Sequence, residues 1–462
     1  MADNVDAKLA ALEAFLQDHP AIKFIPPSSP HYPAARKVFH DGRLDNPLAI
    51  IQPQSPTDVS TVIKYAKAHS IPFTIRAGGH NLEGRAIVEG ALVIDLRAFT
   101  AVTVSSDRKS AIIQGGILQQ ELANKLWDEG LATPTGTIPS VGYVGWAMYG
   151  GYGPFSANWG LGVDQILGAT VINPNGEIIT ADEDLLKGIR GAGGLFGVIV
   201  DITVKVYPIK SVLTGAIIFD SQDIKKSVIE FNAGYNKLLD AGIPKELTIQ
   251  QAAFNSPHGR AYAALFTWSG SDTEEGLRWS EKITSLGTVI MNTVAPTTIP
   301  AHLAANAALI PPTMYGSSQT HSVRRITPEV AEKIGPILER MPSSPGTMFS
   351  VHESRGTSAE EKSHSVFGTR EPHFMLEILG FATEAEGRAE TEQWAAQAAD
   401  EILQTDPGNV LPTAYLSLLN TLSAAPDDVL KKVFGSHVKE VLDLKEKVDP
   451  ENVYSLMVPL LK

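Results

Sequence analysis

The hydrophobic positions over the first 210 residues change repeatedly between helical and extended spacing. Apolar residues recur every three or four positions over 5–15, which predicts an amphipathic helix. Short continuous apolar runs predict buried strands at 48–51, 73–76, 92–95, 111–113 and 169–172. Helical patterns lie between some of these runs, as at 118–129. The alternation predicts an α+β or α/β first domain.

Several independent signals mark one helix start. Ser55 stands at the capping position, Pro56 at the first turn and the acid Asp58 at the third helical position. An apolar stripe follows from Val59 to Ala66. The sequence therefore predicts a helix that begins at Pro56.

The pattern changes after an apolar strand at 198–208 that ends in proline. Longer strands are predicted at 216–219, 261–268 and 374–379, with helical patterns at 223–239 and 273–286. Thr383 and Glu386 have capping-box spacing ahead of a helical pattern that continues through Trp394. These features predict an antiparallel sheet covered by helices and a domain boundary near residue 210.

Composition narrows the function classes. At 462 residues, two domains are expected. The 38 basic and 51 acidic residues give a formal charge of −13, which argues against nucleic acid or an anionic membrane as a partner. The chain contains no cysteine, so disulfides, thiolate metal sites and cysteine nucleophiles are excluded. No metal site is predicted.

The two ends of the chain carry no recognisable targeting pattern. The first residues are acidic and amphipathic, without the basic segment and apolar core of a secretory signal. No run approaches the roughly 18 apolar residues of a membrane helix, and the last three residues are not a peroxisomal tripeptide. We expect an intracellular, cytoplasmic protein.

The most informative loop follows the predicted strand at 73–76 and reads Ala77-Gly78-Gly79-His80-Asn81. Two adjacent glycines let backbone N–H groups converge on an anion, because no Cβ stands in the way. His80 would then place an imidazole beside the molecule that carries the anion. Taken alone, the loop is equally typical of a tight turn with a surface histidine.

Three further segments are rich in glycine, hydroxyl or aromatic residues: 133–156, 190–199 and 448–454. A dinucleotide fingerprint does not fit the second of them, because Phe196 stands where its last glycine belongs. A Walker A motif is also absent. The glycines are therefore predicted to contact a large cofactor in some other geometry.

The combination R-x-G-G-H, G-x-x-P-[ST]-V-G and R-G-x-G-G-x-F-G resembles the FAD-binding domain of the vanillyl-alcohol oxidase (PCMH-type) superfamily, and within it the berberine-bridge-enzyme-like group. The resemblance covers about 45–208 well and 438–458 loosely. It implies a two-domain α+β fold with an FAD domain at 1–210, an antiparallel-sheet substrate domain covered by helices at 211–437, and a C-terminal segment at 438–462 that returns to the FAD domain.

The resemblance also implies how FAD is bound. Residues 77–81 would cradle its pyrophosphate, and His80 would bond covalently to the 8α-methyl group of the ring. A neutral imidazole is a competent nucleophile for that bond. The full set of implied FAD-binding residues is Arg76, Ala77, Gly78, Gly79, His80, Asn81, Gly136, Thr137, Ile138, Ser140, Val141, Gly142, Gly145, Gly197, Val198, Ile199 and Tyr454.

Many relatives make a second bond to the flavin from a cysteine. The matching position here is Ile138, and no cysteine exists elsewhere in the chain. The resemblance therefore implies a single attachment through His80. A single link is expected to leave the ring less constrained, and its potential lower, than in doubly linked relatives.

The catalytic base is less well indicated. In relatives it comes from the sheet of the substrate domain or from a Y-x-N-Y strand near the C-terminus. The matching strand, 414–418, keeps Tyr415 but has Ser417 and Leu418 at the other two positions, so the phenolate base is in doubt. The other candidates, each with a structural role as the alternative, are His352, Glu353, His373, Tyr143 and Tyr149.

These features predict an FAD-dependent oxidoreductase that oxidises a small organic, secondary-metabolite-like substrate, with oxygen as the electron acceptor. The alternatives are a non-redox cyclase on a flavoprotein scaffold, an alcohol or carbohydrate oxidase or dehydrogenase, and a non-catalytic FAD-binding protein. The expected partners are the substrate and oxygen, with no nucleic acid and no membrane; the oligomeric state stays open.

Overall fold

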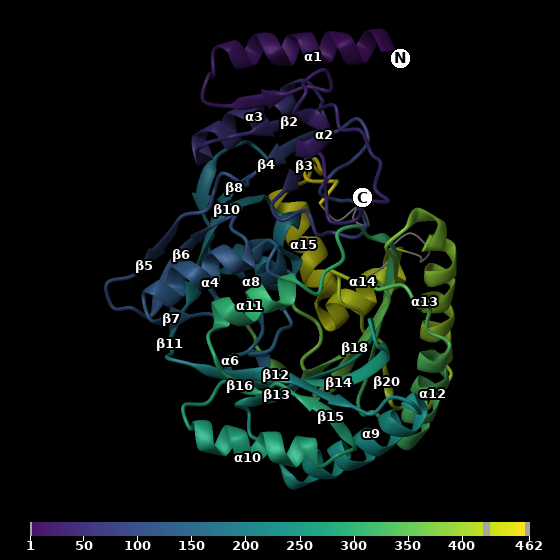
Figure 1. Cartoon of the computed structure of the whole chain (residues 1–462). Helices are drawn as coiled ribbons and strands as arrows, with labels where there is room; N and C mark the ends of the chain where they lie inside the picture. Colours follow the sequence, from purple (N-terminus) through teal and green to yellow (C-terminus); the bar gives the residue numbers. More distant parts are fainter. Residues whose placement is uncertain (1, 419–425, 458–462) are drawn as a thin grey trace.

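A computed structural model of the chain describes residues 2–418 and 426–457. The chain forms two parts: the first 210 residues occupy the upper half of Figure 1, and a large sheet with its helices occupies the lower half. The last strand of the upper part ends at Pro208, and the first strand of the large sheet begins at Val212. Mixed helices and antiparallel sheets confirm the predicted α+β class.

The first sheet carries the glycine–histidine loop. Its strand order is β1-β2-β4-β3, and both β2 and β3 run parallel to β4. The elements around it are α1 (Ala2–Gln17), β1 (Lys23–Ile25), α2 (Tyr32–Ala35), β2 (Ala49–Gln52), α3 (Pro56–Ala68), β3 (Phe73–Arg76) and β4 (Leu92–Asp95). The predicted cap of α3 is present, since Ser55 and Asp58 each accept a hydrogen bond from the other's backbone N–H. The loop therefore leaves the carboxyl end of a buried parallel strand.

The second sheet is antiparallel, in the order β5-β6-β10-β8-β9. Its strands are β5 (Val102–Val104), β6 (Ser110–Gln114), β8 (Ile166–Ile172), β9 (Ile178–Thr180) and β10 (Val198–Lys205). The helices beside it are α4 (Gln119–Asp128), α5 (Tyr143–Met148), α6 (Ser156–Trp159), α7 (Gly162–Gln165) and α8 (Glu183–Ala192), and a small ribbon pairs β7 (Leu131–Ala132) with β11 (Tyr207–Pro208). Its core joins strands β6, β8 and β10 to α4, α5 and α8.

The third sheet has nine strands in the order β15-β12-β14-β13-β18-β19-β17-β20, with β16 paired to β12. These are β12 (Val212–Phe219), β13 (Leu247–Ser256), β14 (Gly259–Trp268), β15 (Val289–Asn292), β16 (Ala295–Thr297), β17 (Tyr315–Val323), β18 (Met348–Ser354), β19 (His373–Ala382) and β20 (Val410–Leu411). The helices are α9 (Ile224–Ala241), α10 (Thr273–Thr284), α11 (Ile299–Ala307), α12 (Pro328–Glu339) and α13 (Arg388–Leu403). Strand residues alternate between two faces: one packs under α9, α12 and α13, and the other faces the first domain.

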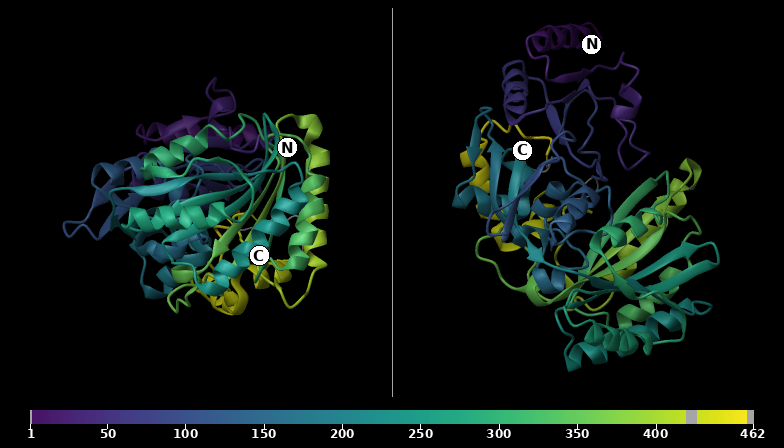
Figure 2. Two further views of the ribbon diagram at one scale, coloured as in Figure 1. Left: turned by 60° about the horizontal axis from the view of Figure 1, so that its bottom comes forward. Right: turned by 60° about the vertical axis from the view of Figure 1, so that its left-hand side comes forward.

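The C-terminal helices return to the first domain. Val429 and Phe434 of α14 (Pro426–Phe434) and Val441 of α15 (Val438–Val448) share a core with Ile189 of α8. Figure 2 shows these helices beside the strands of the first domain. The return thus begins at α14, ahead of residue 438.

Two local predictions were wrong. Thr383 does not cap a helix, because residues 385–387 form a short 3₁₀ turn and α13 begins at Arg388 without a side-chain cap. Residues 414–418 do not form a strand either; the segment is irregular and ends in a turn. Pro412 precedes the segment and has no N–H to donate to a neighbouring strand. The apolar spacing of 414–418 alone therefore predicted a strand that does not form.

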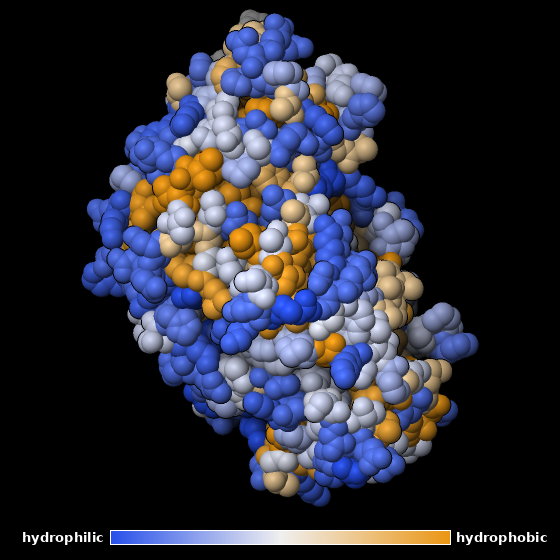
Figure 3. Space-filling view, turned by 90° about the vertical axis from the view of Figure 1, so that its left-hand side faces the viewer, coloured by the Kyte–Doolittle hydropathy of each residue, from blue (hydrophilic) through white to orange (hydrophobic). Residues whose placement is uncertain are grey.

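Some apolar side chains lie at the surface. On the side of the molecule in Figure 3, they gather across the middle, with smaller groups towards the lower end. The strands of the second sheet expose Ile112, Leu167 and Ile178. Within the described ranges, no helix combines the length and the apolar character needed to cross a membrane.

Candidate functional site

Two glycine loops of the first domain meet backbone to backbone. A Cβ placed on Gly78 would lie 2.3 Å from the nitrogen of Gly142 and 2.8 Å from the carbonyl oxygen of Ser140. Gly79 has φ of +72°, a conformation that residues with a Cβ rarely adopt. These contacts explain why the first loop needs two adjacent glycines.

The first loop offers a row of unused backbone donors. Within the described part of the chain, no group accepts a hydrogen bond from the N–H of Gly78, Gly79, His80 or Asn81. Consecutive free N–H groups form a concave site for an anion. A Cβ on Gly145, in the first turn of α5, would meet nothing within 4 Å, so there is room beside this turn. The loops therefore fit the pyrophosphate of FAD, which would lie against them.

His80 is held on two sides. Its Nε2 lies 2.9 Å from the hydroxyl oxygen of Ser140, and its ring stacks on Phe39 with a centroid distance of 4.2 Å and an interplanar angle of 25°. Burial lowers the pKa of His80 to about 4, so the imidazole is neutral at pH 7. Nδ1 has no hydrogen-bond partner and is not among the buried unpartnered atoms of the described residues, so it is the accessible nitrogen.

Arg76 fixes the backbone of the segment that carries Phe39. Its guanidinium donates to the carbonyl oxygens of Ala35 and Lys37, at the base of the segment that carries Phe39. The N–H of Phe39 in turn donates to the carbonyl of Gly79 at 3.0 Å. The side chain of Arg76, predicted to bind FAD, is thus used to hold the stacking partner of His80.

The second loop is anchored by the substrate domain. The side-chain amide of Asn306, in α11, donates to the carbonyl oxygen of Thr137 at 3.0 Å, next to Ile138. The N–H of Gly136 donates to Gln119 at 3.3 Å, and that of Val141 donates to the Ile138 carbonyl at 3.3 Å. Around Ile138, the loop is therefore held by hydrogen bonds to Asn306 and Gln119 and by one within the loop.

The third predicted cofactor segment lies inside the second sheet. Val198 and Ile199 pair with Ile172 and Val171 of β8, and a Cβ on Gly197 would lie 2.4 Å from the side chain of Val171. The buried hydroxyl of Tyr454 donates to the carbonyls of Ile172 and Asn173, at 2.7 and 3.0 Å. The Tyr454 hydroxyl is therefore committed to holding the C-terminal segment against β8.

An aromatic cluster joins the two domains. The hydroxyl of Tyr152 lies 2.9 Å from Nε2 of His373, whose Nδ1 lies 2.7 Å from the carbonyl of Glu371. A carbonyl only accepts, so Nδ1 carries the proton and Tyr152 donates to Nε2. Tyr415 packs edge-on to Tyr152, with ring centroids 5.1 Å apart, and its hydroxyl accepts from Gly151 at 3.2 Å. Burial lowers the pKa of His373 to about 4 and raises those of both tyrosines.

A polar pair lies on the face of the large sheet that looks towards the first domain. Nε2 of His352 is 2.9 Å from Oε2 of Glu377, and the two side chains are 14% and 15% exposed. A carboxylate can only accept, so His352 carries its proton on Nε2 and leaves Nδ1 as an acceptor. Gln250 and Ser350 lie on the same patch. A cavity of about 10 Å³ separates His352 from the loop at Tyr152.

Two predicted catalytic residues, Glu353 and Tyr143, lie away from this patch. Glu353 faces the helix layer, where it accepts from Tyr235 at 2.8 Å and pairs with Arg355 at 3.1 Å; the strand alternation turns it away from His352. Tyr143 is fully buried, and its hydroxyl lies 3.3 Å from that of Thr133. Both side chains are therefore bonded within the core, and their catalytic role stays a prediction.

Tyr149 lies closer to the loops. Burial raises the pKa of its hydroxyl, and the nearby guanidinium of Arg85 opposes this shift. Arg85 itself donates to the carbonyls of Leu416 and Met457, both at 3.3 Å. It therefore links the first loop to the segment after Tyr415 and to the C-terminal segment, while the role of Tyr149 stays a prediction.

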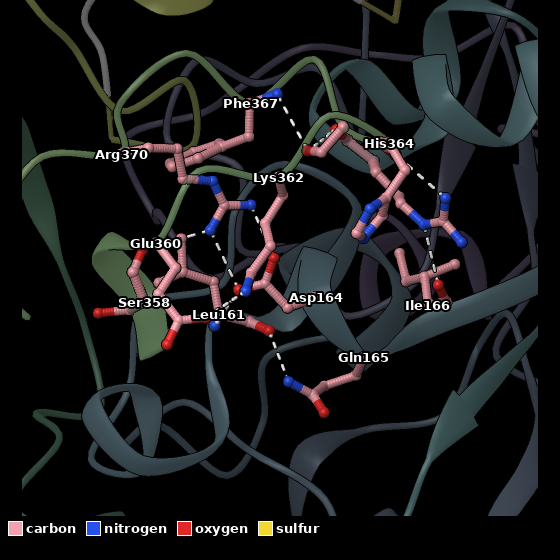
Figure 4. Close-up of polar contacts among 12 residues, drawn as sticks. Leu161, Asp164, Gln165, Ile166, Ser358, Glu360, Lys362, His364, Phe367 and Arg370 are labelled. Carbon is pink, nitrogen blue, oxygen red and sulfur yellow. Dashed lines mark hydrogen bonds and ion pairs between the residues drawn. The ribbon is translucent and has the colours of Figure 1, made fainter. Parts of the chain in front are cut away.

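A buried ion pair positions the loop that leads to His373. Asp164 of α7 receives two hydrogen bonds from Arg370, at 2.7 and 3.0 Å, and both side chains are at most 5% exposed. Figure 4 shows Asp164 beneath Arg370 at the junction of the two domains. Arg190 also donates to the carbonyls of Ile166 and His364, at 2.9 and 3.0 Å. The two arginines tie this loop to the first domain.

Sequence reasoning missed Phe39, Glu377 and, as a partner of His373, Tyr152. The position of Glu377 was predictable, because alternate residues of a strand share a face and Glu377 stands two and four residues after Met375 and His373 in one strand. No sequence pattern indicated that Phe39 contacts His80, because Phe39 lies in an irregular segment 41 residues before it.

The fold and the glycine loops together define a flavoprotein. A family model described as "FAD binding domain" matches residues 47–182. The chain is 31% identical to the FAD-linked oxidoreductase aurO of Gibberella zeae, covering 96% of this chain and 87% of that protein. It is 27% identical to (R)-6-hydroxynicotine oxidase of Paenarthrobacter nicotinovorans, with 92% and 93% covered. The chain therefore belongs to the berberine-bridge-enzyme-like family of FAD-dependent oxidoreductases.

Solved structures agree on the fold. The 6-hydroxy-D-nicotine oxidase of Arthrobacter nicotinovorans superposes with a TM-score of 0.80 at 22% identity, covering 94% of this chain and 96% of that one. Berberine bridge enzyme of Eschscholzia californica gives 0.82 at 18% identity, with 96% and 97% covered. At these identities the comparison concerns the architecture alone.

Proposed function

We propose that this enzyme oxidises a small organic substrate by hydride transfer to FAD, which His80 holds through a single covalent bond, and that oxygen is the electron acceptor. The observation that carries the proposal is the setting of His80: a neutral imidazole with one accessible nitrogen, beside a row of free backbone donors. When bound, FAD supplies the two-electron acceptor, and the protein supplies binding, orientation and proton transfer.

The geometry of His80 supports attachment through Nδ1. Ser140 engages Nε2, whereas Nδ1 is accessible and unpartnered. With Nδ1 as the nucleophile, the proton on Nε2 can leave through the Ser140 hydroxyl, so the alkylated ring ends neutral. Phe39 covers one face of the ring and restricts its rotation. The absence of cysteine leaves His80 as the sole residue for a family-type attachment.

His352 is the best-placed base. Hydride loss from carbon requires a proton to leave the neighbouring oxygen or nitrogen, and a nearby base assists this step. Nδ1 of His352 is free to take that proton, and Glu377 stabilises the resulting imidazolium from the other side of the ring. The Tyr152–His373 pair is more deeply buried, and its two polar groups already satisfy each other. We propose that the hydrogen bond between Tyr152 and His373 orients the loop that carries Tyr152 above the sheet.

The substrate class follows from the surroundings of this patch. Apolar and aromatic side chains of Leu161, Val163, Phe367 and Met375 pack around Tyr152 and Tyr415. In sequence, the oxidase named for 6-hydroxynicotine matches 92% of this chain and the chitooligosaccharide oxidase of Gibberella zeae matches 44% of it, although the folds of both kinds of oxidase match nearly all of it. Both features favour a small aromatic or heterocyclic compound over an oligosaccharide.

Anaerobic mixing tests the reaction class. The enzyme is mixed without oxygen with a panel of aromatic alcohols, cyclic amines and oligosaccharides while the flavin absorbance is followed. We expect an aromatic or heterocyclic member to bleach the flavin and air to restore its colour with hydrogen peroxide released. Product formation without bleaching would establish a non-redox cyclase instead, and bleaching by oligosaccharides alone would overturn the substrate class.

A further inference from the structure

The large sheet opens at its edge where β20 leaves it. β17 and β20 pair at two positions only, ending with Ser322 opposite Leu411. Two residues further along, an antiparallel ladder would place Thr320 opposite Thr413. This hydrogen-bonded pair is missing: no described residue accepts a hydrogen bond from the N–H of Thr413. Pro412, between the two strand partners, has no N–H and a fixed φ, which ends the strand.

The missing pair borders a cavity of about 240 Å³. Leu403, Val410, Leu411 and Pro412 form its apolar walls. The volume lies below the roughly 300–1,000 Å³ of pockets for drug-sized ligands, so it suits a compact molecule. The catalytic candidates His352 and Glu377 do not line it, but Thr320 lies opposite Glu377 in the pairing of β17 with β19, so the cavity borders the site described above.

Four polar side chains line this cavity without a partner among residues 2–418 and 426–457. The hydroxyls of Thr320 and Thr413 are buried without a hydrogen bond, and Thr320 is only 5% exposed. His321 is half-buried and Lys432 is exposed, and neither side chain makes a hydrogen bond or ion pair with the described part of the chain. Buried polar groups are almost always satisfied in folded proteins. Two unsatisfied threonine hydroxyls beside one cavity therefore indicate a ligand.

The charges around the cavity indicate which ligand. Burial lowers the pKa of His321 to about 4, with Lys432 adding to the shift and Asp400 opposing it, so the imidazole is neutral at pH 7. Lys432 is then the charged group that lines the cavity. A carboxylate can accept hydrogen bonds from an ammonium and from two hydroxyls together. An apolar body would cover the walls, which a hydrated inorganic anion would leave uncovered.

We propose that this cavity binds a small organic carboxylate with an apolar body, its carboxylate between Lys432 and the two threonine hydroxyls. The site also adjoins the catalytic region through the segment at 414–415. The N–H of Ala414 donates to the carbonyl of Lys432 at 3.0 Å, and Tyr415 follows directly. A bound carboxylate would hold the segment that carries Tyr415.

Crystals of the holoenzyme soaked in 4-bromobenzoate test the site, because the anomalous signal of bromine locates the probe. Calorimetry with 4-bromobenzoate and with neutral 4-bromobenzamide measures the affinity. We expect bromine in the cavity, and at least tenfold weaker binding of the amide. Lys432→Met should weaken benzoate binding at least fivefold and Thr320→Val about threefold, the latter keeping the side-chain volume.

Lys431→Met is the matched control, because Lys431 is an exposed neighbour in α14 that does not line the cavity. Its affinity for 4-bromobenzoate should equal that of the wild type. The proposal is overturned if bromine lies elsewhere, if the cavity holds only water at saturating probe, or if Lys432→Met binds as tightly as Lys431→Met. Equal affinity for the acid and the amide would also overturn it, and each outcome is independent of the proposed reaction.

Discussion

The two halves of the candidate site are built in different ways. In the first domain, backbone groups of residues 77–81 and 136–145 make the site, and glycines allow two loops to touch. In the second domain, side chains from neighbouring strands make it, and His352 meets Glu377 only because β18 and β19 pair in one register. A site made of backbone groups in one loop can be recognised from a short contiguous sequence motif. The surface of a sheet cannot, because it depends on pairing between segments that are distant in sequence.

The largest expected effect comes from closing the contact between the loops. Gly78→Ala places a methyl group 2.3 Å from the nitrogen of Gly142, so the loops must separate and the cradle is lost. We expect purified Gly78→Ala to carry almost no flavin, measured as the ratio of flavin to protein absorbance. Gly168→Ala is the control, because its methyl group would meet only ordinary contacts at 3.7 Å or more. Full flavin loading of Gly78→Ala would show that the cradle does not depend on this contact.

The buried ion pair that joins the two halves should matter next. Asp164→Asn leaves the guanidinium of Arg370 buried without its charge partner. We expect a loss of about 3 kcal/mol in the free energy of unfolding, since breaking one side of a buried pair costs several kcal/mol. Denaturant unfolding measures it, and Asp240→Asn, which breaks the exposed pair with Arg325, should cost less than about 1 kcal/mol. Equal losses in the two variants would contradict the bracing role.

The sheet half can be tested by comparing its two faces. Glu377→Gln should lower kcat/KM about 100-fold, because His352 loses the carboxylate that stabilises its charged form. Glu353→Gln lies on the helix-covered face, so it should lower thermal stability while kcat/KM per folded enzyme changes less than about threefold. A larger kinetic loss from Glu353→Gln than from Glu377→Gln would reverse the assignment of the faces.

The smallest effect concerns pH. The pKa of His80 is lowered to about 4, so the imidazole stays neutral, and nucleophilic, well below the usual histidine pKa. The rate of covalent attachment, followed after adding FAD to apoprotein made under riboflavin limitation, should stay constant between pH 7.5 and about 5. It should then fall as pH approaches 4 and His80 becomes protonated. A decline centred near pH 6.5 would mean that burial does not control this group.

The difference between local loop motifs and sheet surfaces also explains which features could be predicted from the sequence. The helix at Pro56, the strand ahead of His80 and the FAD class were predictable, because each depends on local spacing. The face on which Glu353 lies was not predictable, because it depends on the register of β18 beside its neighbours. Tyr454 looked like a cofactor contact, and only the fold shows its hydroxyl bonded to β8. Thr413 and Thr320 are 93 residues apart in sequence, and no local pattern relates them.

The most direct test of the central claim is the identity of the flavin peptide. The protein is precipitated with acid and digested, and the yellow peptide is sequenced by tandem mass spectrometry and compared with synthetic Nδ1- and Nε2-alkylated histidylflavins. The account predicts flavin on the His80 peptide alone, attached through Nδ1, with Ser140→Ala giving a mixture of both isomers. Flavin released entirely into the acid supernatant, or attached through Nε2 in the wild type, would contradict it.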